Sequence, residues 1–404
     1  MRDQPLVDEP LHRARAIEVF FVFLKLGLTS FGGPVAHIAY FRREFVLRRL
    51  WLDESAFGDL VSLCQFLPGP ASSQLGMAVG WQRAGIMGSL AAWLGFTLPS
   101  ALLMVLFALS FSVLGLSSES AWIHGLKIAA VAVVGQAVWG MGKNLAPDRV
   151  RATLAAGVAV VLLWFHGTVV QMLVIAVGAV AGLLFLTPVQ GLAPLRPRRT
   201  SFRWGGRFPL ASFFALLVGL PLAAAYTSSY PLDLVAEFYR AGALVFGGGH
   251  VVLPLLQTSV VFPGWVTESQ FLAGYGAAQA VPGPLFTFAG YLGALSSQNP
   301  SGWIGGGLAL IAIFLPAFLL IAGVLPFWET LKAEAWAQKA VMGINASVVG
   351  ILLAAFYDPV WTSAVRSPAD FALVVVCFMG LVLWELPPIL VVAFAAVAAS
   401  LGWG

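Results

Sequence analysis

The chain has 404 residues, of which 59% are hydrophobic and 10% are charged, and its mean hydropathy is +0.89. Soluble chains carry about 25% charged residues, so this composition excludes a soluble enzyme, a disordered chain and a coiled coil. What remains is a polytopic membrane protein, in which the net charge of +4 marks loops rather than an affinity for nucleic acid.

In chain order, residues 1–15 are polar and show no cleavable signal peptide, and we expect them in the cytoplasm. The apolar segment 17–41 is interrupted at Ser30–Pro34, and the segment 56–81 is interrupted at Pro68–Pro70. Apolar segments of suitable length for membrane helices follow. They are 85–114, 122–141, 152–165, 169–186, 208–226, 304–327, 340–356, 371–384 and 388–401.

The two interruptions recur at a nearly constant offset in the second half of the chain. Phe31-Gly32-Gly33 matches Phe246-Gly247-Gly248, and Pro68-Gly69-Pro70 matches Pro282-Gly283-Pro284. Such an ordered series indicates an internal repeat. We predict a first membrane repeat over 16–190, a basic linker and one connecting helix over 191–230, and a second membrane repeat over 231–404.

The placement of charge predicts the orientation of the repeats. The loop Arg42–Arg49 is basic, as is the N-terminal segment, so both are expected in the cytoplasm. Segment 17–41 would then be a re-entrant hairpin, because its first arm of about 15 residues would rise only about 22 Å, less than the ~30 Å membrane core. The matching loop 255–267 has no Lys or Arg and is expected outside.

We therefore predict an all-α polytopic membrane protein with two inverted-topology repeats and re-entrant or broken helices. The alternative is two fully crossing pairs in a parallel duplication.

The breaks are the first candidate binding site. Inverted repeats with interrupted helices are a recurring plan of secondary transporters, because a broken helix frees backbone amides inside the membrane. The alternative is a set of hinges or close helix crossings. The candidate residues at the breaks are Gly32, Gly33, Gly247, Gly248, Pro68, Gly69, Pro70, Pro282, Gly283 and Pro284.

Two cations stand inside apolar segments at matching positions. Lys25 and Arg240 each precede a Phe-Gly-Gly sequence by six residues. A buried cation in a membrane is costly, so this duplication suggests attraction of an anion. The alternatives are a cation that reaches the membrane interface, or a structural pair with Glu18 or with Asp233 and Glu237.

Further polar residues lie beside the breaks. His37 and His250 are candidates for proton coupling, together with Glu18 and Asp233. Gln65 and Gln279 offer amide donors suited to oxyanion oxygens, and Ser72 and Thr287 add hydroxyls. The alternative for each is an ordinary structural hydrogen bond.

The sequence lacks the residue patterns of metal binding, nucleotide binding and hydrolysis. Cys64 and Cys377 form no metal-ligand spacing, and no nucleotide-binding or hydrolase motif occurs. We expect no cofactor, no metal and no enzymatic activity.

The combination of Phe31–Ile38, Gln65–Pro70 and Phe96–Ser100 resembles the chromate ion transporter family in its long, two-domain form. The resemblance implies export of chromate from the cytoplasm by oppositely oriented halves. The second copy departs from the pattern, because Gly249 replaces Pro34 and the Arg42–Arg49 run has no counterpart.

Chromate is a dianion, and a dianion that leaves a negative-inside cell gains roughly 4.6 kcal/mol at 100 mV, so export needs no ATP. We predict transport of chromate, driven by membrane potential, a proton gradient or both, with alternating access between the repeats. Expected partners are chromate, protons and the lipid bilayer of the plasma membrane (bacterial inner membrane); a homodimer is compatible with the sequence. The alternatives are a transporter or channel for sulfate or another oxyanion, or an intramembrane enzyme.

Overall fold

A computed structural model describes residues 9–113, 120–187 and 206–403, and within these ranges it is helical and has no strand. The basic linker predicted at Arg196–Arg207 lies outside the described residues except for its last residues, and so does much of the N-terminal segment 1–15.

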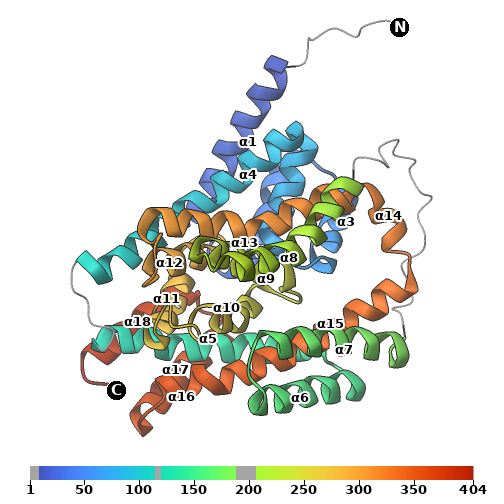
Figure 1. Cartoon of the computed structure of the whole chain (residues 1–404). Helices are drawn as coiled ribbons and strands as arrows, with labels where there is room; N and C mark the ends of the chain where they lie inside the picture. Colours follow the sequence, from blue (N-terminus) through green and yellow to red (C-terminus); the bar gives the residue numbers. More distant parts are fainter. Residues whose placement is uncertain (1–8, 114–119, 188–205, 404) are drawn as a thin grey trace, which may run out of the picture.

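Every apolar segment predicted to be helical forms a helix (Figure 1). The helices of the first half are α1 (Glu9–Thr29), α2 (Gly33–Arg42), α3 (Glu54–Phe66), α4 (Ala71–Val113), α5 (Ala121–Leu145), α6 (Arg149–Trp164) and α7 (Thr168–Phe185), and α8 (Arg207–Thr227) connects the halves. The helices of the second half are α9 (Tyr230–Leu244), α10 (Val252–Val260), α11 (Glu268–Ala280), α12 (Phe288–Leu295), α13 (Gly302–Val324), α14 (Trp328–Leu331), α15 (Ala335–Ala355), α16 (Thr362–Ala364), α17 (Pro368–Val382) and α18 (Pro388–Ser400). Short 3-10 or π segments join some of them at Arg43–Arg48, Gly249–Val251, Leu285–Thr287, Leu325–Phe327 and Phe356–Trp361.

Local sequence explains where equivalent helices begin. Asp53 caps α3 by accepting a hydrogen bond from the Ala56 backbone N–H at 2.7 Å. At the equivalent position Thr267 caps α11 and forms a capping box with Gln270.

The long helix α4 is two helices joined at a kink. Ala84 and Gly85 have non-helical backbone angles, and Gly85 has a φ of +61°, which favours glycine. The kink separates the arm that follows the Pro-Gly-Pro break from the apolar segment predicted at 85–114.

Six helical stretches within the described residues are long and apolar enough to cross a membrane. They are Ala71–Phe111, Ala121–Leu145, Thr168–Phe185, Arg207–Thr227, Gly302–Phe327 and Ala335–Ala364. The chain is thus a multi-pass membrane protein.

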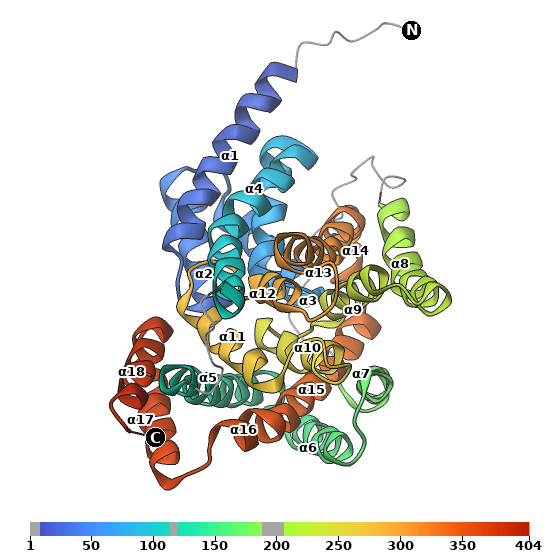
Figure 2. The ribbon, with the colours of Figure 1, turned by 60° about the vertical axis from the view of Figure 1, so that its left-hand side comes forward.

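The last two helices of each half pack against a long helix of the other half. Helix α5 of the first half packs against α17 and α18 of the second, and α15 of the second packs against α6 and α7 of the first (Figure 2). The approach is close at Gly125 of α5, where a Cβ atom would lie 2.3 Å from the Ala395 carbonyl oxygen in α18. At Gly343 of α15 a Cβ atom would lie 2.0 Å from the Gly178 carbonyl oxygen in α7. The halves are therefore interlocked.

Helices α5 and α15 run in opposite directions in Figure 1. The end of α4 and the start of α5 lie at the left, whereas α14 and the start of α15 lie at the right. Helices α5 and α15 also pack against each other along the lower part of the molecule.

Candidate functional site

Each of the four breaks contains a glycine in the left-handed region. Gly32 and Gly33 have φ angles of +97° and +75°, and Gly247 has a φ of +74°. In the two Pro-Gly-Pro sequences, Gly69 has a φ of +123° and Gly283 a φ of +98°. Other residues adopt these angles rarely, which explains why glycine stands at each break.

The breaks of one half pair with the breaks of the other through the backbone. The Gly69 N–H donates to the Val245 carbonyl oxygen at 2.6 Å, and the Gly283 N–H donates to the Ser30 carbonyl oxygen at 2.9 Å. Each bond joins the Pro-Gly-Pro break of one half to the Phe-Gly-Gly break of the other. The two bonds are therefore reciprocal, as expected for repeats that face each other.

The backbone hydrogen bonds and one further close approach bring all four breaks into one region, which we call the break junction: residues 30–34, 68–70, 245–249 and 282–284. A Cβ atom on Gly249 would lie 3.6 Å from Cγ of Pro34, which joins the two Phe-Gly-Gly breaks. A Cβ atom on Gly283 would lie 2.9 Å from the Ser100 hydroxyl oxygen, so α4 also borders the junction.

Four helical segments begin at the break junction. Helices α2 and α4 begin directly after the first two breaks, and α10 and α12 begin after the other two through short 3-10 turns. The starts of α2 and of both 3-10 turns have no side-chain cap. Helix N-termini carry uncompleted N–H groups and partial positive charge, so the junction is suited to an anion. The carbonyl oxygens of Ser30 and Val245, beyond the ends of α1 and α9, accept the two reciprocal bonds.

Buried polar atoms without a partner gather near the junction. They include the hydroxyl oxygens of Ser30 and Thr97 and the Nδ1 atom of His37. In the second half they include the amide oxygen of Asn345, which would lie 3.4 Å from a Cβ atom on Gly247. An unpartnered buried polar group costs about 1–3 kcal/mol, so a cluster of them calls for water or a polar ligand.

The two histidines have different surroundings. His37 is buried, its Nε2 atom lies 3.3 Å from the Ser30 carbonyl oxygen, and its ring meets the edge of Phe96 at 5.2 Å between centroids. The Nδ1 atom of His250 forms a 2.7 Å hydrogen bond with the Tyr275 hydroxyl. The Nδ1 atom of His37 is buried and has no partner, and His37 lies at the junction.

The two cations also differ, although their sequence positions match. Lys25 is exposed on α1, on the same stripe as Ile17 and Phe21, which are 59% and 62% exposed. Arg240 is largely buried in an ion pair with Glu237 and donates hydrogen bonds to the Thr168 and Ser259 hydroxyls, both at 3.1 Å. The matching positions thus differ in burial, because α7 and α10 cover Arg240 whereas Lys25 is uncovered.

Glu18 belongs to an arginine cluster and not to a pair with Lys25. It forms ion pairs of 3.1 Å with both Arg49 and Arg83, and Arg49 also bonds Glu44 at 2.6 Å. Burial of the Glu44 carboxyl favours a higher pKa, but hydrogen bonds from Arg49 and Arg48 bring the pKa below the ordinary glutamate value. Asp233 lies in the first turn of α9.

The remaining predicted site residues differ in burial. Gln65 is exposed on α3, so its amide does not match the half-buried Gln279. Ser72 and Thr287 are buried beside the breaks, and the Thr287 hydroxyl donates to the Pro284 carbonyl oxygen at 2.9 Å. That bond is the ordinary structural one of a membrane hydroxyl.

Two buried polar residues are not among the predicted site residues. Lys127 of α5 is 1% exposed and donates to the Ser269 hydroxyl at 3.0 Å, and its single charge within an apolar helix was the available signal. Gln74 is fully buried and donates to the Pro68 carbonyl oxygen at 2.7 Å, where it supports the first Pro-Gly-Pro break. No sequence signal singled out Gln74.

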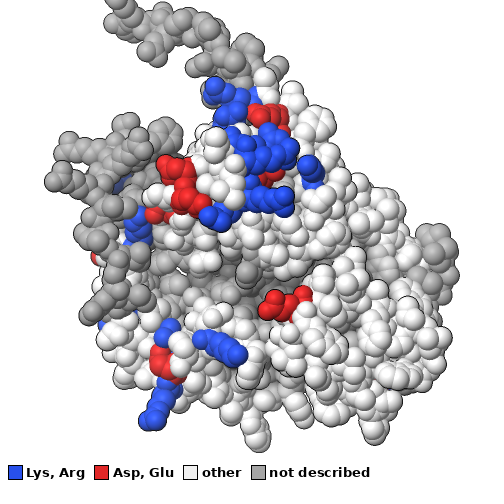
Figure 3. All heavy atoms as spheres, turned by 180° about the vertical axis from the view of Figure 1, so that it is seen from behind, with Lys and Arg blue, Asp and Glu red and all other residues white. Residues whose placement is uncertain are grey.

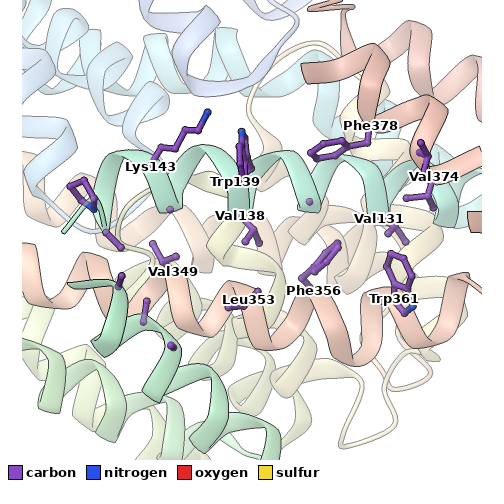
Figure 4. A pocket seen from close by; sticks show the side chains of 18 of the residues that line it. Val131, Val138, Trp139, Lys143, Val349, Leu353, Phe356, Trp361, Val374 and Phe378 are labelled. Carbon is purple, nitrogen blue, oxygen red and sulfur yellow. The ribbon is translucent and has the colours of Figure 1, made fainter. Parts of the chain in front are cut away.

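Two cavities lie apart from the break junction. A polar cavity of about 340 Å³ is lined by residues that include His166, Gln171 and Glu268. An apolar cavity of about 830 Å³ lies among α5, α6, α15 and α17 (Figure 4). Across the described residues, no group of three or more His, Cys, Asp or Glu side chains is placed to hold a metal ion.

Broken helices, membrane-spanning stretches and paired repeats together are typical of a membrane transporter. The protein-family model described as chromate transporter matches residues 17–183 and 232–401, so the chain belongs to the chromate transporter family in its two-domain form. No solved structure matches the chain.

Relatives in this family cover most of the chain. A chromate transport protein of Pseudomonas aeruginosa is 31% identical over 87% of this chain and 83% of its own length. A probable chromate transport protein of Synechococcus elongatus is 28% identical over 94% of both chains. A chromate transport protein of Cupriavidus metallidurans is 26% identical over 96% of this chain and 92% of its own length.

Proposed function

We propose that this protein exports chromate from the cytoplasm across the bacterial plasma membrane and binds it at the break junction. The observation that carries this proposal is the meeting of all four breaks, joined by two reciprocal backbone hydrogen bonds. Family membership and the relatives named for chromate transport support the choice of anion.

At the junction, chromate meets hydrogen-bond donors rather than a compensating ion. Helix N-termini at Gly33 and Ala71, together with the Ser30 and Thr97 hydroxyls, offer N–H and O–H groups to tetrahedral oxygens. Gln279, three residues before the second Pro-Gly-Pro break, adds an amide donor. A site built on neutral donors binds a dianion without holding it as tightly as fixed cations would, which favours release.

We propose that Lys25 and Arg240 act in this transport in different ways. The exposed charge of Lys25 attracts the anion toward the junction, whereas Arg240 with Glu237 holds α9 against α7 and α10.

The two repeats are inserted in opposite directions in this proposal. Helices α4 to α7 return the chain to the side on which they begin, and α8 takes it across once more. The basic residues flanking α4 to α8, together with those just before and at the start of α15, then share one side, which the positive-inside rule makes cytoplasmic. They are Arg83, Lys143, Arg149, Arg151, Arg207, Lys332 and Lys339.

The surface charge supports this insertion. Figure 3 shows Lys and Arg side chains gathered in two groups on one face, with a largely uncharged surface elsewhere on it. The opposite directions of α5 and α15 in Figure 1 support it as well.

Transport is driven by the membrane potential and coupled to protons through His37, and the repeats alternate access to the junction. His37 is suited to this role because one ring nitrogen bonds Ser30 at a break and the other is unpartnered. Protonation there adds positive charge beside the anion.

Chromate uptake into everted membrane vesicles tests the function. We expect an inside-positive potential to drive accumulation, because the dianion moves toward positive charge, and an imposed proton gradient to add to it. Uptake that does not respond to the potential would exclude electrogenic movement of chromate. Sulfate at the same concentration as chromate is the control for selectivity: inhibition as strong as that caused by the same amount of unlabelled chromate would identify a general oxyanion transporter.

A further inference from the structure

The apolar cavity among α5, α6, α15 and α17 has a charged residue at one end only. Its volume is about 830 Å³, within the range of ligand pockets, and its walls are aliphatic and aromatic. Among the described residues that line it, Lys143 is the only charged one. Figure 4 shows Lys143 at one end of the α5 segment, with Phe378 and Trp361 toward the other end.

The dimensions of this cavity match one half of a bilayer. Its α5 wall extends from Val131 to Lys143, which corresponds to about 18 Å of helix at 1.5 Å per residue. One leaflet of a ~30 Å hydrocarbon core is about 15 Å deep. An acyl chain that begins at Lys143 would therefore end near the middle of the membrane.

The charged end has the chemistry of a membrane interface. Lys143 lies over the Trp139 ring, with its ammonium 4.4 Å from the ring centroid, and both side chains are largely exposed. Trp and Lys are typical of the headgroup level. The nearby carboxylate of Asp148 is paired with Arg151 at 2.5 Å, so it does not cancel the charge of Lys143.

We propose that this cavity binds one anionic phospholipid, with an acyl chain along α5 and the headgroup phosphate on Lys143. The walls come from both repeats, since α5 and α6 belong to the first and α15 and α17 to the second. The lipid thus lies between the interlocked halves, where its presence affects how they move. This inference does not depend on the transported anion.

Native mass spectrometry of the purified full chain tests this site with phosphatidylglycerol and phosphatidylcholine of identical acyl chains. We expect the wild type to retain phosphatidylglycerol more tightly. Lys143→Gln should weaken phosphatidylglycerol binding about fivefold, as expected for one basic side chain at an anionic lipid surface, and weaken binding of phosphatidylcholine, whose phosphate is balanced by its own choline, clearly less. Lys339→Gln, which removes a basic residue outside the cavity, should behave as the wild type.

A second variant tests the acyl-chain site. A Cβ atom at Gly135 would point between Phe356 and Phe378, at 3.4 and 3.5 Å, so Gly135→Leu should fill the cavity and weaken binding of both lipids. Gly157→Leu on α6, where a Cβ atom has no neighbour within 4 Å, is the matched control. Equal binding of both lipids to the wild type, no effect of Lys143→Gln, or a dimer that excludes lipid would each overturn the proposal.

Discussion

The backbone and the side chain of Ser30 have different roles. Its carbonyl oxygen accepts the Gly283 hydrogen bond that joins the halves, while its buried hydroxyl oxygen has no partner. The backbone atom holds the junction, and the side-chain atom is available to a ligand.

Ser30→Ala should therefore reduce transport without loss of stability. Removing an unpartnered hydroxyl costs the fold nothing, whereas a hydrogen bond to an anion is worth about 1.5–3 kcal/mol. We expect chromate uptake to fall about tenfold or more and the melting temperature to stay the same or rise. Ser62→Ala, which removes an exposed hydroxyl on α3, is the control. A wild-type uptake rate in Ser30→Ala would remove this hydroxyl from the site.

The two cations should respond differently to substitution. Arg240→Gln leaves Glu237 without its partner in a largely buried position, so we expect a loss of about 3 kcal/mol, measured as a fall in melting temperature. Lys25→Gln should change stability by less than about 0.5 kcal/mol, because Lys25 is exposed, but should slow chromate uptake. Unchanged uptake in Lys25→Gln would show that the exposed cation has no part in transport.

The burial and the neighbours of individual residues were harder to predict from the sequence than the helices were. Sequence reasoning matched Lys25 with Arg240 and Gln65 with Gln279, because spacing alone decides such matches. Burial depends on which distant helices cover a residue, as Thr168 and Ser259 show for Arg240. Spacing carries no information about that cover.

At the scale of elements, the sequence predicted the features that depend only on neighbouring residues, namely the helix breaks and the apolar helices. The breaks at Gly32 and Pro68 were predictable because Gly and Pro change the backbone wherever they occur. The apolar helices followed from length and composition. The pairing of Gly69 with Val245 and of Gly283 with Ser30 was not predictable, because it joins residues far apart in the chain.

Gly69→Ala and Gly283→Ala should each disrupt the junction. Both positions have positive φ, and the added Cβ atoms would lie 2.7 Å from Gln74 and 2.9 Å from Ser100. We expect a cost of about 1–3 kcal/mol for each, with loss of chromate uptake. Gly58→Ala in α3, where a Cβ atom meets nothing within 4 Å, should be neutral or stabilising. Full transport in both junction variants would show that their backbone geometry is dispensable.

The arginine cluster predicts a pH effect at the α1–α3 end of the molecule. Because the pKa of Glu44 is lowered in the folded protein, its stabilising effect is complete above the ordinary glutamate pKa of about 4.3 and is lost as the pH falls through the lower folded value. The melting temperatures of wild type and Glu44→Gln should therefore differ at neutral pH and converge in acid. A constant difference across this range would contradict the assignment.

At the scale of the whole molecule, the opposite insertion of the repeats can be measured directly. Leu50 and Phe262 lie in or beside matching loops and are 78% and 53% exposed, and the native Cys64 and Cys377 are buried. Single cysteines at 50 and 262 should react with a membrane-impermeant maleimide from opposite sides, position 50 in everted vesicles and position 262 in intact cells. Labelling of both from the same side would contradict the inverted arrangement.

Because the last two helices of each half pack against the other half, the repeats seen in the sequence cannot be the rigid bodies that move during transport. Because α5 is held by α17 and α18, and α15 by α6 and α7, a rigid body in this transporter must contain pieces of both halves. A gene cut in the linker would produce two polypeptides that each lack the neighbours of their own long helix. Each should be unstable alone and recover on co-expression, and the hinges of the working cycle should fall inside each half rather than between them.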